Sequence, residues 1–127
     1  MQPPKRIVYH RKSRLLDVDF GEGALAIPAE LLRVYSPSAE VRGHGGDQRR
    51  LQTGKKYVGI SRIDPVGNYA VRLSFDDGHD SGLYAWEYLH DLGTHQERYW
   101  NDYLAELKAA NASRLPTIPV GQWNPKN

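Results

Sequence analysis

The chain has 127 residues, with eight tyrosines, three tryptophans, two phenylalanines and no cysteine. A chain of this length forms one domain and can bury a hydrophobic core without cross-links. The lack of cysteine excludes disulfides, thiolate metal ligands, cysteine-bound iron–sulfur clusters and cysteine nucleophiles. Because apolar residues make up only 39% of the chain, aromatic rings are expected to supply much of the core.

The formal net charge is only +2, but the charges are unevenly placed. Between residues 42 and 56, one acid accompanies five bases, which are Arg42, Arg49, Arg50, Lys55 and Lys56. Between residues 86 and 108 there are five acids and two bases. This distribution predicts a dipolar molecule with a basic loop and an acidic helical face.

The sequence contains no segment typical of membrane insertion or export. No apolar run approaches the ~20 residues that span a bilayer. The first six residues lack the apolar stretch of a signal peptide. A cytoplasmic, soluble protein without membrane contact is therefore expected.

The first third of the chain predicts three strands and a short helix. Strands are expected over residues 6–11, 15–20 and 24–27, the second of them because Leu16, Val18 and Phe20 alternate with polar residues. Pro28 suits the first turn of a helix, which continues to Tyr35. A glycine-rich segment over residues 43–48 is expected to form a flexible surface loop.

The middle of the chain predicts a three-stranded antiparallel meander over residues 57–63, 69–75 and 79–84. The pairs Gly67-Asn68 and Asp77-Gly78 are typical hairpin turns. The second strand is expected to bury one face, which carries Tyr69, Val71, Leu73 and Phe75.

The last third predicts a helix over residues 85–92, ended by Gly93 in a left-handed conformation. Thr94 then begins a capping box and a longer helix, whose apolar stripe includes Leu104. Trp86 and Trp100 are expected to be buried. Residues 1–110 form the single domain, and residues 111–127 are expected to be a disordered tail.

These elements together predict an α+β fold. Its sheet is expected to be mainly antiparallel, with a short helix and a C-terminal helix packed on one face.

Two short segments suggest a metal site without its metal ligands. They are Tyr35-Ser36-Pro37-Ser38-Ala39-Glu40-Val41 and Asp76-Asp77-Gly78-His79. Together they resemble the N-terminal domain of gamma-butyrobetaine hydroxylase and its small stand-alone bacterial relatives, over roughly residues 14 to 107. In that family a Cys-x-Cys-x-x-Cys run and a histidine from an Asp-Gly-His turn hold zinc, so the resemblance aligns the ligand positions with Ser36, Ser38, Val41 and His79.

Three of the four aligned positions lack a good zinc ligand, because neutral hydroxyls bind zinc poorly and Val41 cannot bind it. The resemblance therefore implies a degenerate zinc site without a cofactor. His79 is interpreted as a structural histidine that forms hydrogen bonds with Ser36, Ser38 or the backbone. A residual metal site made by His79, His44 and a nearby carboxylate is the alternative.

The leading functional hypothesis is a non-catalytic binding or adaptor domain with an unknown protein partner. Relatives of the domain resemble a C-terminal extension of some iron–sulfur P-loop ATPases, which implies a role near iron–sulfur or metalloprotein maturation. The expected contact surface consists of Arg42, His44, Arg49, Arg50, Lys55, Lys56 and His79. One alternative is nucleic-acid binding through the basic loop 42–56, with Tyr35 or Tyr57 stacking on bases. The other is a metal-binding protein or small metal-dependent enzyme centred on His79.

Overall fold

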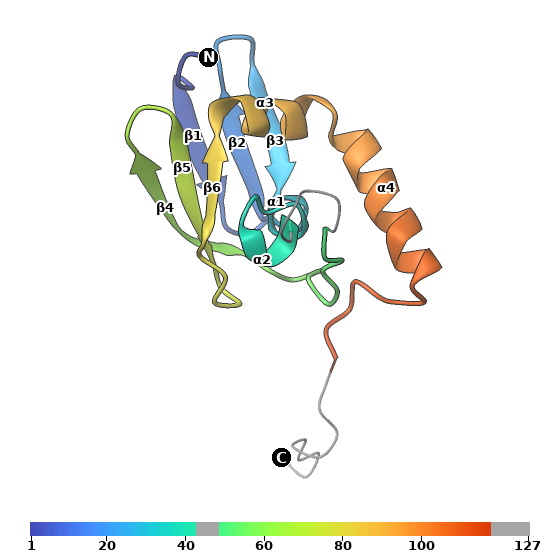
Figure 1. Cartoon of the computed structure of the whole chain (residues 1–127). Coiled ribbons are helices and arrows are strands. Elements are labelled where there is room, and N and C mark those ends of the chain that lie inside the picture. The colour runs from blue at the N-terminus through green and yellow to red at the C-terminus, as the bar shows by residue number, and fades with distance from the viewer. Residues whose placement is uncertain (43–48, 118–127) are drawn as a thin grey trace.

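The computed structural model describes residues 1–42 and 49–117 (Figure 1). Its strands form two three-stranded antiparallel sheets, β1-β2-β3 and β4-β5-β6, and helices complete the α+β fold that the sequence predicts. In chain order the elements are β1 (Arg6–His10), β2 (Leu15–Asp19), β3 (Ala24–Pro28), α1 (Ala29–Val34), α2 (Ala39–Arg42), β4 (Ile60–Val66), β5 (Ala70–Phe75), β6 (Gly82–Ala85), α3 (Trp86–Thr94) and α4 (Gln96–Ala109).

The first sheet follows the alternation in its sequence. Leu16 and Val18 of β2 are fully buried, and so is Ile27 of β3, which pairs with Leu16. Between β2 and β3, Gly21 and Gly23 adopt positive φ angles of 110° and 94°, which L side chains rarely tolerate. The strands predicted for residues 6–28 are therefore confirmed.

Helix α1 follows Pro28 directly and lies inside the molecule. All six of its residues are buried, including the charged Glu30 and Arg33. Since charged side chains are almost never buried without a partner, these two residues must be paired inside the fold.

The first two strands of the second sheet begin later than the sequence predicts. Strand β4 begins at Ile60 instead of residue 57, and β5 begins at Ala70 instead of residue 69. Strand β5 buries Val71, Leu73 and Phe75 as expected. Tyr69 was expected on the same face, but it precedes β5 and is 56% exposed. A Cβ placed on Gly67 would meet the ring of Tyr69 at 2.9 Å, so this ring lies over the turn instead of the core.

The junction of α3 and α4 differs from the predicted one. Helix α3 continues through Gly93, and the break falls at His95, which caps α4 without a side-chain hydrogen bond. A Cβ on Gly93 would lie 2.9 Å from a methyl carbon of Leu25. Gly93 therefore permits the helix to approach β3 closely, and neither the left-handed stop nor the Thr94 cap is present.

Helix α4 covers one side of the molecule (Figure 1). Its buried residues are Tyr103 and Leu107, while Trp100 is partly buried against the core. Leu104 is 39% exposed, so its predicted place in the core is wrong. Trp86, by contrast, is buried as predicted, at 5% exposure.

The segment after α4 is held by the chain that precedes β4. The N–H of Gly54 donates to the carbonyl of Ser113 at 3.0 Å, and that of Lys56 donates to the carbonyl of Arg114 at 3.0 Å. Residues 111–117, which the sequence assigns to a disordered tail, thus lie against the body of the domain. Residues 118–127 of that tail, and the glycine-rich loop 43–48, lie outside the described residues. None of the helices in the described part is long and apolar enough to cross a membrane.

Candidate functional site

A polar cluster, with three buried members and one exposed carboxylate, joins the segment after α1 to the turn after β5. It consists of Ser36, Ser38, Glu40 and His79, and is called the His79 cluster below. The Nε2 atom of His79 lies 2.8 Å from the hydroxyl of Ser36 and 3.3 Å from that of Ser38. The His79 side chain is only 3% exposed. His79 was predicted to bond to Ser36, Ser38 or the backbone, and its Nε2 contacts both serine hydroxyls.

The second ring nitrogen of His79 faces the exposed carboxylate of Glu40. An oxygen of Glu40 lies 3.3 Å from Nδ1 of His79. Because an ionised carboxylate only accepts hydrogen bonds, this contact favours the tautomer with the proton on Nδ1, in which Nε2 accepts a hydrogen bond from serine. Burial lowers the pKa of His79, and the positive charge of Arg33 lowers it further, against the opposite effects of Glu40 and Asp77. The net effect favours the neutral form of the ring.

A second group of contacts lies beside this cluster and centres on Asp77. Its Oδ2 atom accepts hydrogen bonds from Nε of Arg33 at 2.8 Å and from Nζ of Lys55 at 2.6 Å. Its Oδ1 atom accepts the backbone N–H of His79 at 3.1 Å. Arg33 is the buried member, with a side chain 8% exposed. Its Nη1 atom is buried and has no hydrogen-bond partner among the described residues.

The residues present do not fit a zinc ion. The only nitrogen ligand at the aligned positions is His79, whose Nε2 already interacts with two neutral hydroxyls. Val41 is 1% exposed and belongs to the hydrophobic interior. The guanidinium of Arg33 adds a positive charge that would repel a dication. Among the residues described, no three His, Cys, Asp or Glu side chains come together as metal ligands.

The Asp77 contacts predict a loss of stability in acid. Burial alone would raise the pKa of Asp77, but the hydrogen bonds from Lys55, from the His79 backbone and from Arg33 lower it to about 2. A carboxyl whose pKa is lower in the folded state stabilises the fold above its unfolded value and loses that effect as the pH falls through the folded value. We expect the free energy of unfolding to fall by about 1–2 kcal/mol between about pH 4 and pH 2, after allowance for solvent screening.

Urea unfolding measured across this pH range checks the prediction. Asp77→Asn should remove most of the slope, whereas Asp80→Asn, at an exposed neighbouring position, should leave it unchanged. An equal slope in the wild type and in Asp77→Asn would contradict the role of Asp77.

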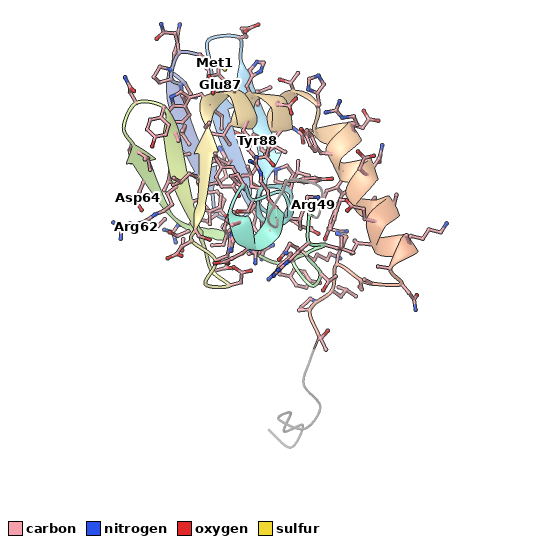
Figure 2. The ribbon with its side chains drawn as sticks, viewed as in Figure 1. Met1, Arg49, Arg62, Asp64, Glu87 and Tyr88 are labelled. Carbon is pink, nitrogen blue, oxygen red and sulfur yellow. The ribbon has the colours of Figure 1, made fainter. Side chains whose placement is uncertain are left out.

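Two of the basic residues predicted as a contact surface are paired with carboxylates inside the fold. Arg49 forms an ion pair with Glu106, donates to the carbonyl of Val34 at 3.0 Å and lies 4.3 Å from the ring centroid of Tyr35. Lys55 is bound to Asp77, as described. Figure 2 shows Arg49 on the side of the molecule that faces α4. Arg49 and Lys55 are therefore engaged in contacts within the domain.

Of the other basic residues of the predicted surface, Arg42 and Lys56 lie beside different tyrosine rings. Arg42 lies over the ring of Tyr88 at 5.0 Å, and Arg50 is exposed. Lys56 lies 5.6 Å from the ring centroid of Tyr57. His44 falls outside the described residues, so the alternative metal site that combines it with His79 stays a prediction.

Sequence reasoning missed Arg33, Asp77 and Glu40 as members of the site. Arg33 gives a usable signal, because it is a charge inside a short helix that is otherwise mostly apolar. Such a charge requires a buried partner. Nothing in the local sequence identifies that partner, since Asp77 is 44 residues away.

Comparisons with known proteins agree with this architecture. The sequence profile of the family "Gamma-butyrobetaine hydroxylase-like, N-terminal" matches residues 7–90. An NMR solution structure with 50% identity aligns over 97% of this chain and 98% of its own, with a TM-score of 0.82. A second NMR solution structure has 52% identity, coverage of 93% and 89%, and a TM-score of 0.79.

A third similar structure is a crystal structure from Acidithiobacillus ferrooxidans, described as a protein of unknown function in the DUF971 family. It is 37% identical over 71% of this chain and 91% of its own, with a TM-score of 0.60. Comparison with the curated proteins found no match. The profile match and these relatives show that the chain belongs to the gamma-butyrobetaine hydroxylase-like N-terminal domain family.

Proposed function

We propose that this domain is a non-catalytic binding or adaptor module in which a degenerate zinc site has become part of the structure. The observation that supports this most is the saturation of His79. Both ring nitrogens have partners in the His79 cluster, and the side chain is 3% exposed. A histidine in this state is poorly placed to bind metal or to exchange protons with a substrate.

The surface that we propose for the partner is formed by Arg42 and Arg50. Both residues are exposed, and neither forms an ion pair within the described part of the chain. They lie close together along the backbone, because the N–H of Arg50 donates at 2.6 Å to the carbonyl of Val41, the residue before Arg42. Two exposed cations that pair with no carboxylate among the described residues favour an acidic protein surface.

The partner that we propose belongs to iron–sulfur or metalloprotein maturation. The support is the family resemblance alone, through relatives that look like an extension of iron–sulfur P-loop ATPases. Since this chain has no cysteine, its contribution would be to hold a partner protein, and the partner would hold the cluster.

Metal analysis tests the degenerate site. Protein purified without an affinity tag or chelator is expected to contain no stoichiometric zinc, and added zinc should leave its melting temperature unchanged. The physical reason is that one histidine with neutral hydroxyls is too weak a ligand set for zinc. Stoichiometric zinc that is lost in His79→Ala would contradict the proposal.

Partner capture tests the surface. Cross-linking in cell extract should identify a protein that binds the wild type but not Arg42→Ala/Arg50→Ala. The matched control is Arg62→Ala/Arg98→Ala, which removes two exposed cations from β4 and α4. Equal capture by the double variant and the control would rule out this surface.

A further inference from the structure

A cleft of about 320 Å³ lies away from the His79 cluster. It is bounded by the turn between β1 and β2, the start of α1, the segment before β4, helix α4 and the segment after α4. Five segments distant in the sequence therefore meet at one hollow, and neither the proposed adaptor role nor the degenerate metal site uses it.

The charged groups of the cleft leave an excess of positive charge. Its lining contains three cations, Arg14, Lys56 and Arg114, and one anion, Glu30. The difference, three minus one, is a local charge of +2. Neither Arg14 nor Lys56 forms an ion pair with any described residue.

The single anion, Glu30, already has hydrogen-bond partners within the domain. The carboxylate of Glu30 accepts hydrogen bonds from Nε and Nη2 of Arg114 at 2.8 and 2.7 Å, and from the hydroxyl of Tyr103 at 3.0 Å. Glu30 is 6% exposed, so it is a fixed anchor for the guanidinium. These contacts leave Nη1 of Arg114 unused, in a side chain that still reaches the surface, at 33% exposure.

The backbone of Arg14 gives an independent indication that its side chain matters. Arg14 adopts a left-handed conformation with φ of 56°, which costs energy for a residue with a Cβ. Its carbonyl accepts the N–H of Ala29 at 2.9 Å, which fixes this geometry beside the start of α1. Glycine or asparagine would fit the same turn with less strain. An unfavourable backbone at a cleft points to a functional side chain.

The other walls of the cleft are apolar and aromatic. They include Leu15, Val58 and the indole of Trp100, over which Arg114 lies at 4.8 Å. At the rim, Tyr57 is 52% exposed and lies 6.0 Å from the Arg14 guanidinium and 5.6 Å from the Lys56 ammonium. Apolar walls with a few fixed polar groups are typical of small-molecule sites.

We infer that this cleft binds a phosphate monoester that carries an apolar or aromatic body. A phosphate dianion matches the local charge of +2, and its three terminal oxygens can accept hydrogen bonds from Arg14, Lys56 and Arg114. The body of the ligand lies against Trp100 and its apolar neighbours. The same chemistry occurs in a free nucleotide and at the 5′ end of a nucleic-acid strand.

Titration with phenyl phosphate, followed by the amide chemical shifts of the whole chain, tests the inference. We expect saturable binding with a Kd of about 1 mM or lower. Arg14→Gly and Lys56→Gln should each weaken it by about tenfold or more. Arg14→Gly should keep the wild-type melting temperature, because the turn tolerates glycine, so loss of binding cannot be attributed to unfolding.

The matched control is Arg62→Gln, which removes an exposed cation from β4, on the side of Figure 2 opposite α4. It should bind like the wild type. Absence of saturable binding, or equal weakening by Arg14→Gly and Arg62→Gln, would overturn the inference. Inorganic phosphate binding as tightly as phenyl phosphate would overturn the role of the apolar walls.

Adenosine monophosphate and a 5′-phosphorylated oligonucleotide then distinguish the two sources. Either ligand supports the site if Arg14→Gly weakens it, and the tighter one identifies the source. Because Arg42 and Arg50 do not line the cleft, their alanine variants should bind phenyl phosphate normally. A failure of the adaptor surface and a failure of the cleft are therefore separate results.

Discussion

Replacing Asp77 with alanine is expected to lower the free energy of unfolding by about 3–5 kcal/mol. Asp77 is the carboxylate partner of Arg33, whose side chain is 8% exposed, and it also holds Lys55. Lys55 can turn toward solvent when the carboxylate is lost. Arg33 cannot, so its charge would stay buried and uncompensated next to Nη1, which already lacks a partner among the described residues.

Urea unfolding at neutral pH measures this effect, and Asp80→Ala provides the matched control. Asp80 is an exposed acid three residues away in the same connection, and its loss should change stability by less than about 0.5 kcal/mol. The double variant Arg33→Met/Asp77→Ala should recover part of the loss, because it removes the buried charge together with its partner. Equal stability of Asp77→Ala and Asp80→Ala would show that the ion pair is not structural.

The contacts of Asp77 also bear on the proposed degenerate zinc site. At the aligned positions a metal would link the α1–α2 connection to the turn after β5. In this chain Ser36 and Ser38 of the α1–α2 connection contact His79, and Arg33 at the end of α1 pairs with Asp77. Hydrogen bonds and an ion pair therefore hold these segments together.

The strands were predictable because their signals are local. In β2 and β5 the alternation of apolar and polar residues gives both the strand and its buried face, and glycines mark the turns. The residues at which the strands begin and end were less predictable. Tyr69 continues the alternation of β5 by sequence, but the turn geometry at Gly67 places its ring outside the core.

The site was predictable only where the family resemblance aligned residues. It placed Ser36, Ser38 and His79 together, which the structure confirms. It could not show that Arg49 pairs with Glu106, 57 residues away, or that Lys55 pairs with Asp77. A count of formal charges makes the loop 42–56 look basic, whereas two of its cations are neutralised by carboxylates that are distant in sequence.

Helix α4 shows how a correct helical period can identify the wrong core residue. Positions 100, 103, 104 and 107 all agree with one stripe, because they are separated by three or four residues. The sequence does not give the rotation of the helix about its axis. The break at His95 resets that rotation between α3 and α4, so the pattern before the break cannot determine which of these residues faces inward.

Leu107→Ala is therefore expected to lower the free energy of unfolding by about 2–5 kcal/mol, the usual range for a leucine truncated inside a core. Leu107 is 5% exposed and belongs to the hydrophobic core cluster. Leu104→Ala is the matched control, because it makes the same chemical change on the same helix at a position that is 39% exposed.

The control should lose less than about 1 kcal/mol, since a half-exposed side chain leaves no closed cavity when it is shortened. Both variants keep a residue with high helix propensity, so the difference between their unfolding free energies, measured in urea, reports burial alone. A larger loss in Leu104→Ala than in Leu107→Ala would mean that α4 is rotated from the orientation described. It would also move Trp100 and Tyr103, and with them the wall of the proposed phosphate cleft and the anchor of Glu30.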